Sequence, residues 1–367
     1  MSGIRERITS LDTIITSLPA VEREVFDRIY RVTVSSGLLK PPASMNTWIE
    51  EQFSSLERAL KQKIIRVTNL VTGEEALFNR LRAERPMRTG RVGEYPFPHQ
   101  NDSSMNPFHA PLSMTPEDVF GRIEGKHCVT ASNVAKHDAF HGVIIFNEHN
   151  PLQFSREQVI DYIDTGCRWA QAAHSYDPEA KYFFFMWNCG GRAGASLPHG
   201  HAQVTLCRSN HYAKIEWLRR TALVYRERYG TSYFDDLYRS HHSVGVGFEK
   251  DMVKVMAYLS PIKEKEVVLI SRELDTSFKE RFYEVLACFR DRMGVTSFNA
   301  AFLLPPIAQV EESWEGFPAI ARIVDRGGIE SRASDIGTME LYAANVISSD
   351  PFEVAGALRK ELGVTAG

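Results

Sequence analysis

Apolar residues near the N-terminus recur at the spacing of one helical face. They do so over Val21–Val32, behind Pro19, and again over Trp48–Leu60, with a break at Gly37–Pro42 between the two stretches. We therefore predict that residues 1–61 form an N-terminal helical segment, which packs as a layer on the rest of the chain.

The pattern then changes to the alternation that is typical of β-strands. Ile64–Val67 and Glu75–Phe78 flank the turn Thr72–Glu74, which predicts a hairpin. Ser155 followed by Gln158 predicts the start of a helix, because such a pair can cap the first turn reciprocally. Four more strands are predicted in this half of the chain, at His127–Ala131, Gly142–Asn147, Tyr182–Asn188 and Ala202–Cys207.

The second half of the chain repeats this order of elements. Strands are predicted at Gly245–Glu249, Met252–Tyr258, Glu266–Ser271, Ser297–Leu304 and Ala319–Asp325, and helices at Ala213–Tyr229, Ser277–Met293 and Pro351–Leu362. The recurring order of strand, strand, helix, strand, loop and strand indicates an internal duplication. The expected fold class is α+β, with repeats at 62–212 and 213–367, each an antiparallel sheet with packed helices.

Composition and charge exclude several classes of protein. The 367 residues are 43% hydrophobic and 24% charged, with a formal charge of −3, so neither disorder nor a dedicated nucleic-acid-binding surface is expected. No apolar run is long enough for a membrane span, and the N-terminus lacks the apolar core of a signal peptide. Five widely spaced cysteines without a CxxC pair argue against a disulfide framework, so we expect a cytoplasmic protein.

The densest chemistry lies between Asn188 and Gln203. His199 and His201 stand two residues apart at the start of a strand, so their side chains share one face. Glycines precede them at positions 190, 191 and 194, where backbone N–H groups can approach phosphate oxygens closely. The residue types therefore suit a ligand that carries phosphate.

Two polar side chains complete this stretch. Ser196 offers a hydroxyl and Gln203 an amide, and both can donate to a phosphoryl oxygen. A neutral imidazole beside such donors can attack phosphorus. A pair of histidines is equally suited to binding a metal, and that alternative stays open at this point.

The whole stretch resembles the active-site string of the galactose-1-phosphate uridylyltransferase family, the transferase branch of the histidine-triad superfamily. The family pattern reads approximately Asn-x-Gly-(x)-x-x-Gly-x-Ser-x-Pro-His-x-His-x-Gln. It is matched without a gap by Asn188, Gly190, Gly194, Ser196, Pro198, His199, His201 and Gln203. Histidine-triad hydrolases carry a third histidine where this chain has Gln203, so the glutamine resembles the nucleotidyltransferase branch.

The resemblance continues outside the string. Arg82 and Arg85 stand in an Arg-x-x-Arg-Pro element, and Gly142–His149 is similar to the strand whose final histidine joins a structural zinc in many members. Asn133 occupies the end of the strand that faces the nucleotide. The stretch Asp335–Tyr342, which contains Glu340, is similar to the C-terminal loop that contacts the sugar.

This resemblance implies a two-step transfer of a nucleotidyl group. His201 would attack the α-phosphorus of a nucleotide-sugar, and a second phosphorylated acceptor would take UMP or AMP from the histidine. Gln203 and Ser196 would hold the phosphoryl oxygens. The implied substrate-binding residues are Asn188, Gly190, Gly194, Arg82, Arg85, Asn133 and Glu340. Family members tend to be homodimers whose sites are completed by the partner's C-terminal loop, so we expect a homodimer.

The chain departs from the family at two places. The CxxC pair that holds zinc in many members is absent, whereas His149 and His199 are present. A zinc site completed by His99 or His109 and plain hydrogen bonding in the core are the two interpretations. The sugar loop has Ser334 or Asp335 where the family usually has lysine, so the sugar does not follow from the sequence, and the altered neighbours of Asn133 leave the base open as well.

Three hypotheses stand beside a uridylyltransferase-like enzyme. On the same fold, the protein would be a phosphorylase or adenylyltransferase that splits an ADP-sugar or a dinucleoside polyphosphate. A non-catalytic nucleotide-binding regulatory protein belongs to another class, but the intact string argues against it. A generic metal-binding α+β domain would explain His199 and His201 and leave Ser196 and Gln203 without a role.

Overall fold

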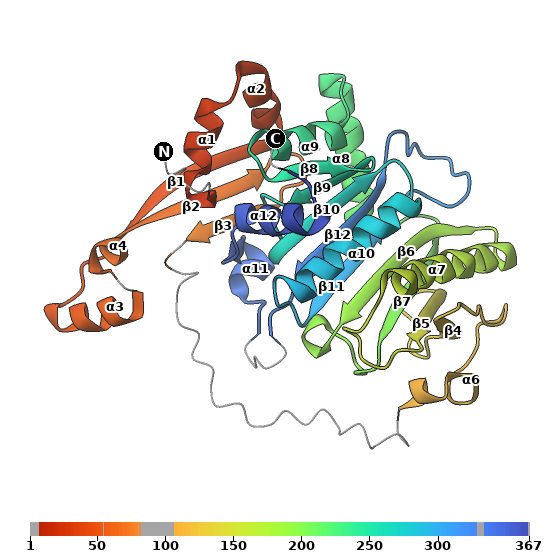
Figure 1. Cartoon of the computed structure of the whole chain (residues 1–367). Helices are drawn as coiled ribbons and strands as arrows, with labels where there is room; N and C mark the ends of the chain where they lie inside the picture. The colour runs from red at the N-terminus through yellow and green to blue at the C-terminus, as the bar shows by residue number, and fades with distance from the viewer. Residues whose placement is uncertain (1–6, 54, 80, 82–105, 329–333, 366–367) are drawn as a thin grey trace.

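The computed structural model describes residues 7–53, 55–79, 81, 106–328 and 334–365. A nine-stranded sheet forms the body, and a four-stranded sheet with the N-terminal helices lies beside it (Figure 1). Within these described ranges, no helix combines the length and the apolar character that crossing a membrane requires. The α+β class expected from the sequence is confirmed.

The large sheet consists of two halves with the same strand order. Its strands are β4 (Cys128–Ser132), β5 (Phe140–Phe146), β6 (Ala180–Cys189), β7 (His201–Arg208), β8 (Gly247–Lys250), β9 (Val253–Ala257), β10 (Glu264–Ser271), β11 (Phe298–Leu303) and β12 (Ala319–Asp325). They are antiparallel throughout, in the order β4-β5-β7-β6-β11-β12-β10-β9-β8. The order β4-β5-β7-β6 is repeated, reversed, as β11-β12-β10-β9, so β6 and β11 join the duplicated halves.

One long helix per half covers the same face of this sheet (Figure 1). Helix α7 (Arg156–Tyr176) begins at the predicted capping box of Ser155 and Gln158, and α10 (Thr276–Asp291) is its counterpart. The other helices of the second half are α8 (Ala213–Tyr229), α9 (Tyr233–Ser243), the short α11 (Thr338–Tyr342) and α12 (Pro351–Leu362). The predicted bounds of α8 and α12 agree with the structure.

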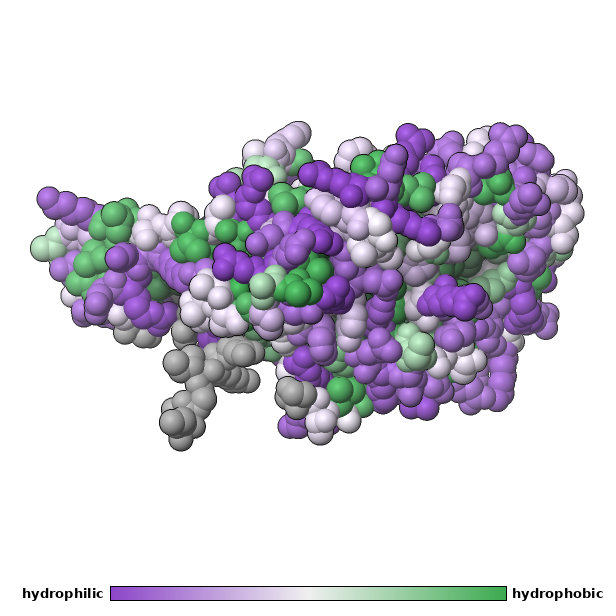
Figure 2. Space-filling model, turned by 90° about the horizontal axis from the view of Figure 1, so that it is seen from above, coloured by the Kyte–Doolittle hydropathy of each residue, from purple (hydrophilic) through white to green (hydrophobic). Residues whose placement is uncertain are grey.

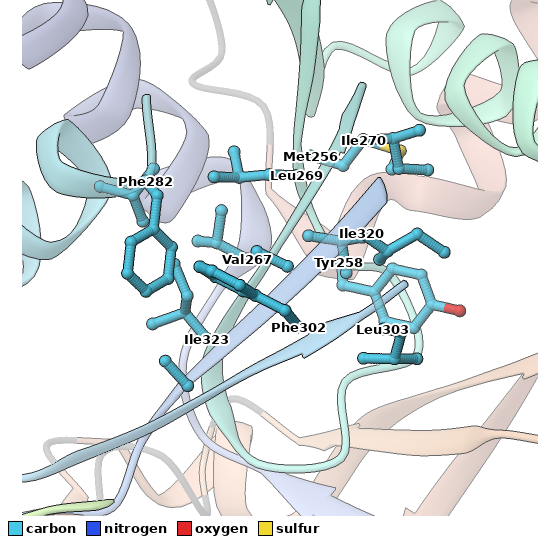
Figure 3. Packing of buried hydrophobic residues seen from close by; sticks show 14 of the residues in the cluster. Met256, Tyr258, Val267, Leu269, Ile270, Phe282, Phe302, Leu303, Ile320 and Ile323 are labelled. Atoms are coloured by element: carbon cyan, nitrogen blue, oxygen red, sulfur yellow. The ribbon is translucent and has the colours of Figure 1, made fainter. Parts of the chain in front are cut away.

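The core lies between these helices and the sheet. Phe302 of β11 packs against Phe282 of α10 with ring centroids 4.8 Å apart, and Val267, Leu269 and Ile323 lie on the same side of the sheet as this pair (Figure 3). All five side chains are buried. Apolar burial of this extent stabilises the fold by about 25 cal/mol per Å² and holds the strand ends in place.

The N-terminal segment is not wholly helical, which corrects the prediction for residues 1–61. Helices α1 (Leu11–Ser17) and α2 (Ala20–Ile29) are followed by strand β1 (Tyr30–Leu38), and α3 (Asn46–Phe53) and α4 (Leu56–Leu60) come after it. The run Val32-Thr33-Val34 is β-branched and pairs in full register with β2. Pairing with a distant strand therefore overrides the helical spacing at Val32.

The second sheet has the order β1-β2-β3-β13, with β2 (Lys61–Asn69), β3 (Glu75–Asn79) and β13 (Asn345–Ile347). The predicted hairpin between β2 and β3 is confirmed. Helices α3 and α4 project from the body at the far end of β1 and β2, and hydrophobic residues lie on the surface of this lobe (Figures 1 and 2). Met45 and Trp48 are among them.

A buried polar network connects the two sheets. Arg322 of β12 donates from Nε to Glu266 Oε1 at 2.6 Å and from Nη1 to Glu74 Oε1 at 2.5 Å. The hydroxyl of Tyr258 donates to Glu74 Oε2 at 2.8 Å, and Asn69 donates to the Tyr258 oxygen. Glu266 is 2% exposed, and burial raises the pKa of its carboxyl while Arg322 opposes that shift. The guanidinium therefore compensates carboxylates from both sheets.

A glycine on β5 allows α7 to approach the sheet closely. A Cβ on Gly142 would lie 2.7 Å from Cε2 of the fully buried Trp169. We expect Gly142→Ala to lower the free energy of unfolding by about 1–3 kcal/mol, because the indole must shift in a packed core. The measurement is urea denaturation followed by tryptophan fluorescence.

Gly356 supplies the matched control for this substitution. It lies inside α12, and a Cβ there would meet no atom within 4 Å. Gly356→Ala should leave the protein unchanged or stabilise it by up to about 1 kcal/mol, since alanine favours helix. Equal effects of the two substitutions would contradict the close approach of Trp169.

Candidate active site

The loop between β6 and β7 carries the candidate active site. Asn188 lies at the end of β6 and His201 is the first residue of β7. Gly190 and Gly194 have φ angles of 84° and 91°, which only glycine adopts without strain. A Cβ on Gly190 would also lie 3.1 Å from Oγ of Ser297. These glycines make the tight loop possible.

The ring of His201 has one defined hydrogen bond. Its Nδ1 lies 2.8 Å from the backbone carbonyl oxygen of His199, and the side chain is buried. A carbonyl oxygen only accepts, so Nδ1 carries the proton and Nε2 keeps its lone pair. Burial lowers the pKa of His201, although the bond to His199 opposes this shift. The ring is therefore neutral near pH 7, with a free nucleophilic nitrogen.

Gln203 projects from the same face of β7 as His201, while Ala202 and Val204 lie on the other face, in the main core. Its Oε1 lies 2.8 Å from Nε2 of His141 on the neighbouring strand β5. Ser196 is exposed on the glycine-containing loop. The sequence analysis did not identify His141 as a site residue. His141 and Val143 are two residues apart on β5, so their side chains lie on the same face of the strand.

Asn188 is held by the second repeat. Its Oδ1 accepts from Nδ2 of Asn299 on β11 at 2.7 Å, which leaves its own amide N–H groups available to a ligand. Nη1 of Arg326 donates to Asn299 Oδ1 at 2.5 Å, and Arg326 pairs with Asp335 through two bonds of 2.8 and 3.0 Å. This chain of bonds joins the candidate active-site loop to Asp335 at the start of the segment Asp335–Tyr342, and the sequence did not indicate Asn299 or Arg326.

A small apolar cluster lies on the sheet beside the two histidines. It consists of Val129, Ala131, Val143 and Ile145, with the partly buried Phe108 packed against it. In the strand register, Ile145 lies opposite His201 and Val143 opposite Gln203. The ring of Phe108 stands at 65° to that of His201, with centroids 5.3 Å apart. This cluster places buried apolar side chains next to His201.

Asn133, predicted to bind substrate, lies just after β4 and close to this group. Its Oδ1 accepts from the backbone N–H of Ala135 at 3.0 Å, and its Nδ2 is 3.3 Å from Nε2 of His141. The structure therefore brings Asn133, His141 and Gln203 together on one side of His201.

Three histidines form a cluster that includes His199, two residues before His201. Among the described residues, His109, His149 and His199 offer ring nitrogens that all lie within 4.8 Å of one another. The Nδ1 atoms of His149 and His199 are 3.2 Å apart, close to the separation of about 3.3 Å between two nitrogens on a tetrahedral zinc. Nε2 of His199 donates to the carbonyl of Phe146 at 2.8 Å, as the outer nitrogen of a metal-bound histidine commonly does.

Glu340 lies apart from His201. Its Oε2 accepts from the N–H of Gly337 at 2.8 Å, which caps α11. It lines a cavity of about 1140 Å³ together with Arg192, Lys263, Arg326 and Asp335, while neither His201 nor Gln203 belongs to the described lining. Within one chain, the structure does not bring Glu340 next to His201. Arg82, Arg85 and His99 lie outside the described residues.

Several solved structures have a fold similar to that of this chain. An ADP-glucose phosphorylase from Arabidopsis thaliana with bound ADP-glucose has a TM-score of 0.61 and 15% identity, over 81% of this chain and 99% of that one. A GalT-like protein from Arabidopsis thaliana has a TM-score of 0.56 and 15% identity, over 71% and 93% of the chains. A uridylyltransferase has a TM-score of 0.55 and 14% identity, over 82% and 98%.

This chain shares its fold with these proteins, which include an ADP-glucose phosphorylase and a uridylyltransferase. The sequence itself is distant, since no family model and no curated protein matches it. In the second repeat, β12 contains no histidine, and the adjacent His241 and His242 lie in the last turn of α9.

Proposed function

We propose that this protein is a nucleotidyltransferase that moves a UMP or AMP group from a nucleotide-sugar to a sugar 1-phosphate through a nucleotidyl-His201 intermediate. One observation carries the proposal. The His199 carbonyl fixes the proton of His201 on Nδ1, so the free lone pair of Nε2 stands beside a glycine-containing loop. The nucleotidyltransferases and phosphorylases among the proteins with this fold support the same reaction class.

The chemistry balances without a further reactant. Nε2 of His201 forms a bond to the α-phosphorus, and the bond from this phosphorus to the bridging oxygen breaks. The leaving sugar phosphate takes the electron pair. An oxygen of the acceptor phosphate then attacks the same phosphorus, and the bond to Nε2 breaks with return of the lone pair. Nδ1 keeps its proton through both steps.

Donors around this loop stabilise the phosphoryl oxygens in the proposed reaction. The amide N–H groups of Gln203 and Asn188, the hydroxyl of Ser196 and the backbone N–H groups of the loop are the candidates. The apolar cluster beside His201, defined above, accepts the base. Asn133 lies at its edge and contributes a polar contact to the nucleotide.

A phosphorylase that uses inorganic phosphate as acceptor is the second candidate. Asp335, which with Ser334 is one of the two residues that could stand where the family usually has lysine, is bound on both oxygens by Arg326. It is therefore engaged within the chain instead of facing a sugar. The Arabidopsis thaliana phosphorylase that shares this fold has ADP-glucose bound, which is a precedent for such a donor.

We also propose that the site is completed in a homodimer. Helix α11 buries none of its residues, and Met339, Leu341 and Tyr342 are 42%, 61% and 84% exposed. Such an exposed apolar surface beside Glu340 is typical of a contact with a neighbouring subunit, where it would be removed from water. Analytical ultracentrifugation of the intact protein measures the state directly, and a monomer at micromolar concentration contradicts the proposal.

A zinc ion on His109, His149 and His199 is a further part of the proposed function. The described part of the chain supplies three of the four ligands of a tetrahedral site, and the ion would add rigidity there. The backbone carbonyl of His199 accepts the hydrogen bond from Nδ1–H of His201. A His199 that is held by the metal would therefore also hold the proposed nucleophile in place.

Zinc content after His109→Ala tests this part. His109 is exposed and stacked on His149, so its loss should leave the fold intact. We expect about one zinc per wild-type chain by plasma mass spectrometry, and a weaker site in the variant that loses zinc to a mild chelator. His137→Ala is the matched control, since His137 is also exposed and stacked on a histidine. Equal zinc in all three proteins, or none in the wild type, counts against the site.

Intact mass spectrometry tests the reaction itself. The wild-type protein is mixed separately with UDP-glucose, UDP-galactose, ADP-glucose and a diadenosine polyphosphate. A covalent adduct with the mass of UMP or AMP, released by glucose 1-phosphate or by phosphate, supports the proposal and identifies base and acceptor. A folded protein that forms no adduct with any donor would favour the non-catalytic nucleotide-binding alternative.

A further inference from the structure

His141 is a buried histidine next to the candidate site whose protonation state can be deduced. It lies on β5 and is fully buried. The backbone N–H of His137 donates to its Nδ1 at 2.9 Å. A backbone N–H is always a donor, so Nδ1 must carry a lone pair, and the proton of the neutral ring is on Nε2.

That proton determines how Gln203 is oriented. The Gln203 side-chain atom 2.8 Å from Nε2–H has to be an acceptor, so it is the carbonyl oxygen Oε1. Asn133 cannot take its place, because its Oδ1 already accepts from Ala135 and its Nδ2 is itself a donor. The amide of Gln203 therefore has one allowed orientation, with its NH₂ group directed away from His141.

The ring of His141 stays neutral in this environment. Burial lowers the pKa of His141, and the neighbouring His137 and Lys136 lower it further, while the bond to Gln203 and the more distant Asp118 oppose them. These are the groups that face the ring. His137 and Lys136 come from the β4–β5 connection, Gln203 from β7 and Asp118 from the segment before β4.

The orientation matters because phosphoryl oxygens only accept hydrogen bonds. With its NH₂ group presented, Gln203 stabilises the charge that develops on the phosphorus oxygens. After rotation by 180°, it would present a carbonyl oxygen and repel them. The two orientations have nearly the same shape, so packing alone selects poorly between them.

We propose that His141 is a positioning residue that holds the Gln203 amide in the orientation required for transfer of the nucleotidyl group. This inference rests on the proposed function, but it concerns a residue outside the family string. His141 acts through Gln203 and does not touch the phosphorus. The expected effect of losing it is a drop in kcat of about 10- to 100-fold with little change in KM, less than the loss of a direct donor.

A double-mutant cycle tests the coupling. His141→Met removes the donor at similar volume, and His141→Gln keeps an N–H group at the position of Nε2. We expect His141→Met to lower the rate of adduct formation by about 10- to 100-fold in the wild-type background and by less than about 2-fold in the Gln203→Ala background. His141→Gln should recover most of the rate. Equal losses in both backgrounds would show a merely structural role and overturn the proposal.

A second measurement does not depend on activity. ¹⁵N NMR of the histidine rings in the intact protein should show His141 as the Nε2–H tautomer, with its signal displaced in Gln203→Ala. A Nδ1–H tautomer, or a signal that Gln203→Ala leaves unchanged, overturns the proposal whatever the enzyme does. If the wild-type protein forms no adduct, the proposed function fails, and the NMR result then decides the orientation of Gln203 by itself.

Discussion

Replacing His201 with alanine is expected to abolish adduct formation and to lower turnover by about 10⁴-fold or more. His201 supplies the only atom that bonds to phosphorus in the proposed first step, and His199, the other histidine at the end of the loop, cannot take its place. Nε2 of His199 is already bound to the Phe146 carbonyl, and its Nδ1 faces His149. The measurement combines intact mass spectrometry with steady-state rates on the donor that labels the wild type.

His174→Ala serves as the control for this loss. His174 lies in α7, on the opposite face of the sheet, and its Nδ1 bonds the carbonyl of Ala180. The control should keep adduct formation within a few-fold of the wild type. An adduct that survives in His201→Ala, with circular dichroism unchanged, would mean that another residue is the nucleophile.

The largest expected effect on stability concerns the network between the two sheets. Arg322→Leu removes the guanidinium that compensates Glu266 and Glu74, whose side chains are 0% and 19% exposed. A buried carboxylate without its partner is strongly unfavourable. We expect the free energy of unfolding to fall by about 3 kcal/mol, measured by urea denaturation at pH 7.

Two further variants identify the cause of that loss. The double variant Arg322→Leu with Glu266→Gln should recover part of it, since a neutral amide is less costly to bury than a carboxylate. Arg272→Leu, which breaks an exposed pair with Glu273, should change stability by less than about 0.5 kcal/mol. A loss that the Glu266→Gln change leaves unaltered would assign the effect to packing of the Arg322 side chain.

The elements whose information is local were predictable from the sequence. The capping box at Ser155 and Gln158 marks the start of α7 in the structure, and the β2–β3 hairpin follows its turn. Both depend on residues a few positions apart. Strand β1 was missed because its pairing with β2 joins Tyr30 to Asn69, and helical spacing at Val32 does not reveal such a distant partner.

The same distinction applies to the candidate site. The string from Asn188 to Gln203 is continuous along the chain, so its residues and their order on one loop and one strand could be deduced from the sequence. The residues that set their chemistry come from elsewhere. His141 is 62 positions from Gln203, and Asn299 is 111 positions from Asn188.

The sequence by itself therefore determined which residues stand together on one loop and one strand, and it predicted His201 as the nucleophile among them. Only the tertiary structure decided which nitrogen of His201 is free, how Gln203 is turned and that His109 lies beside His149 and His199. The physical reason is that proton positions and ligand clusters depend on hydrogen bonds across strands. Their partners follow from sheet register, which spacing along one strand does not contain.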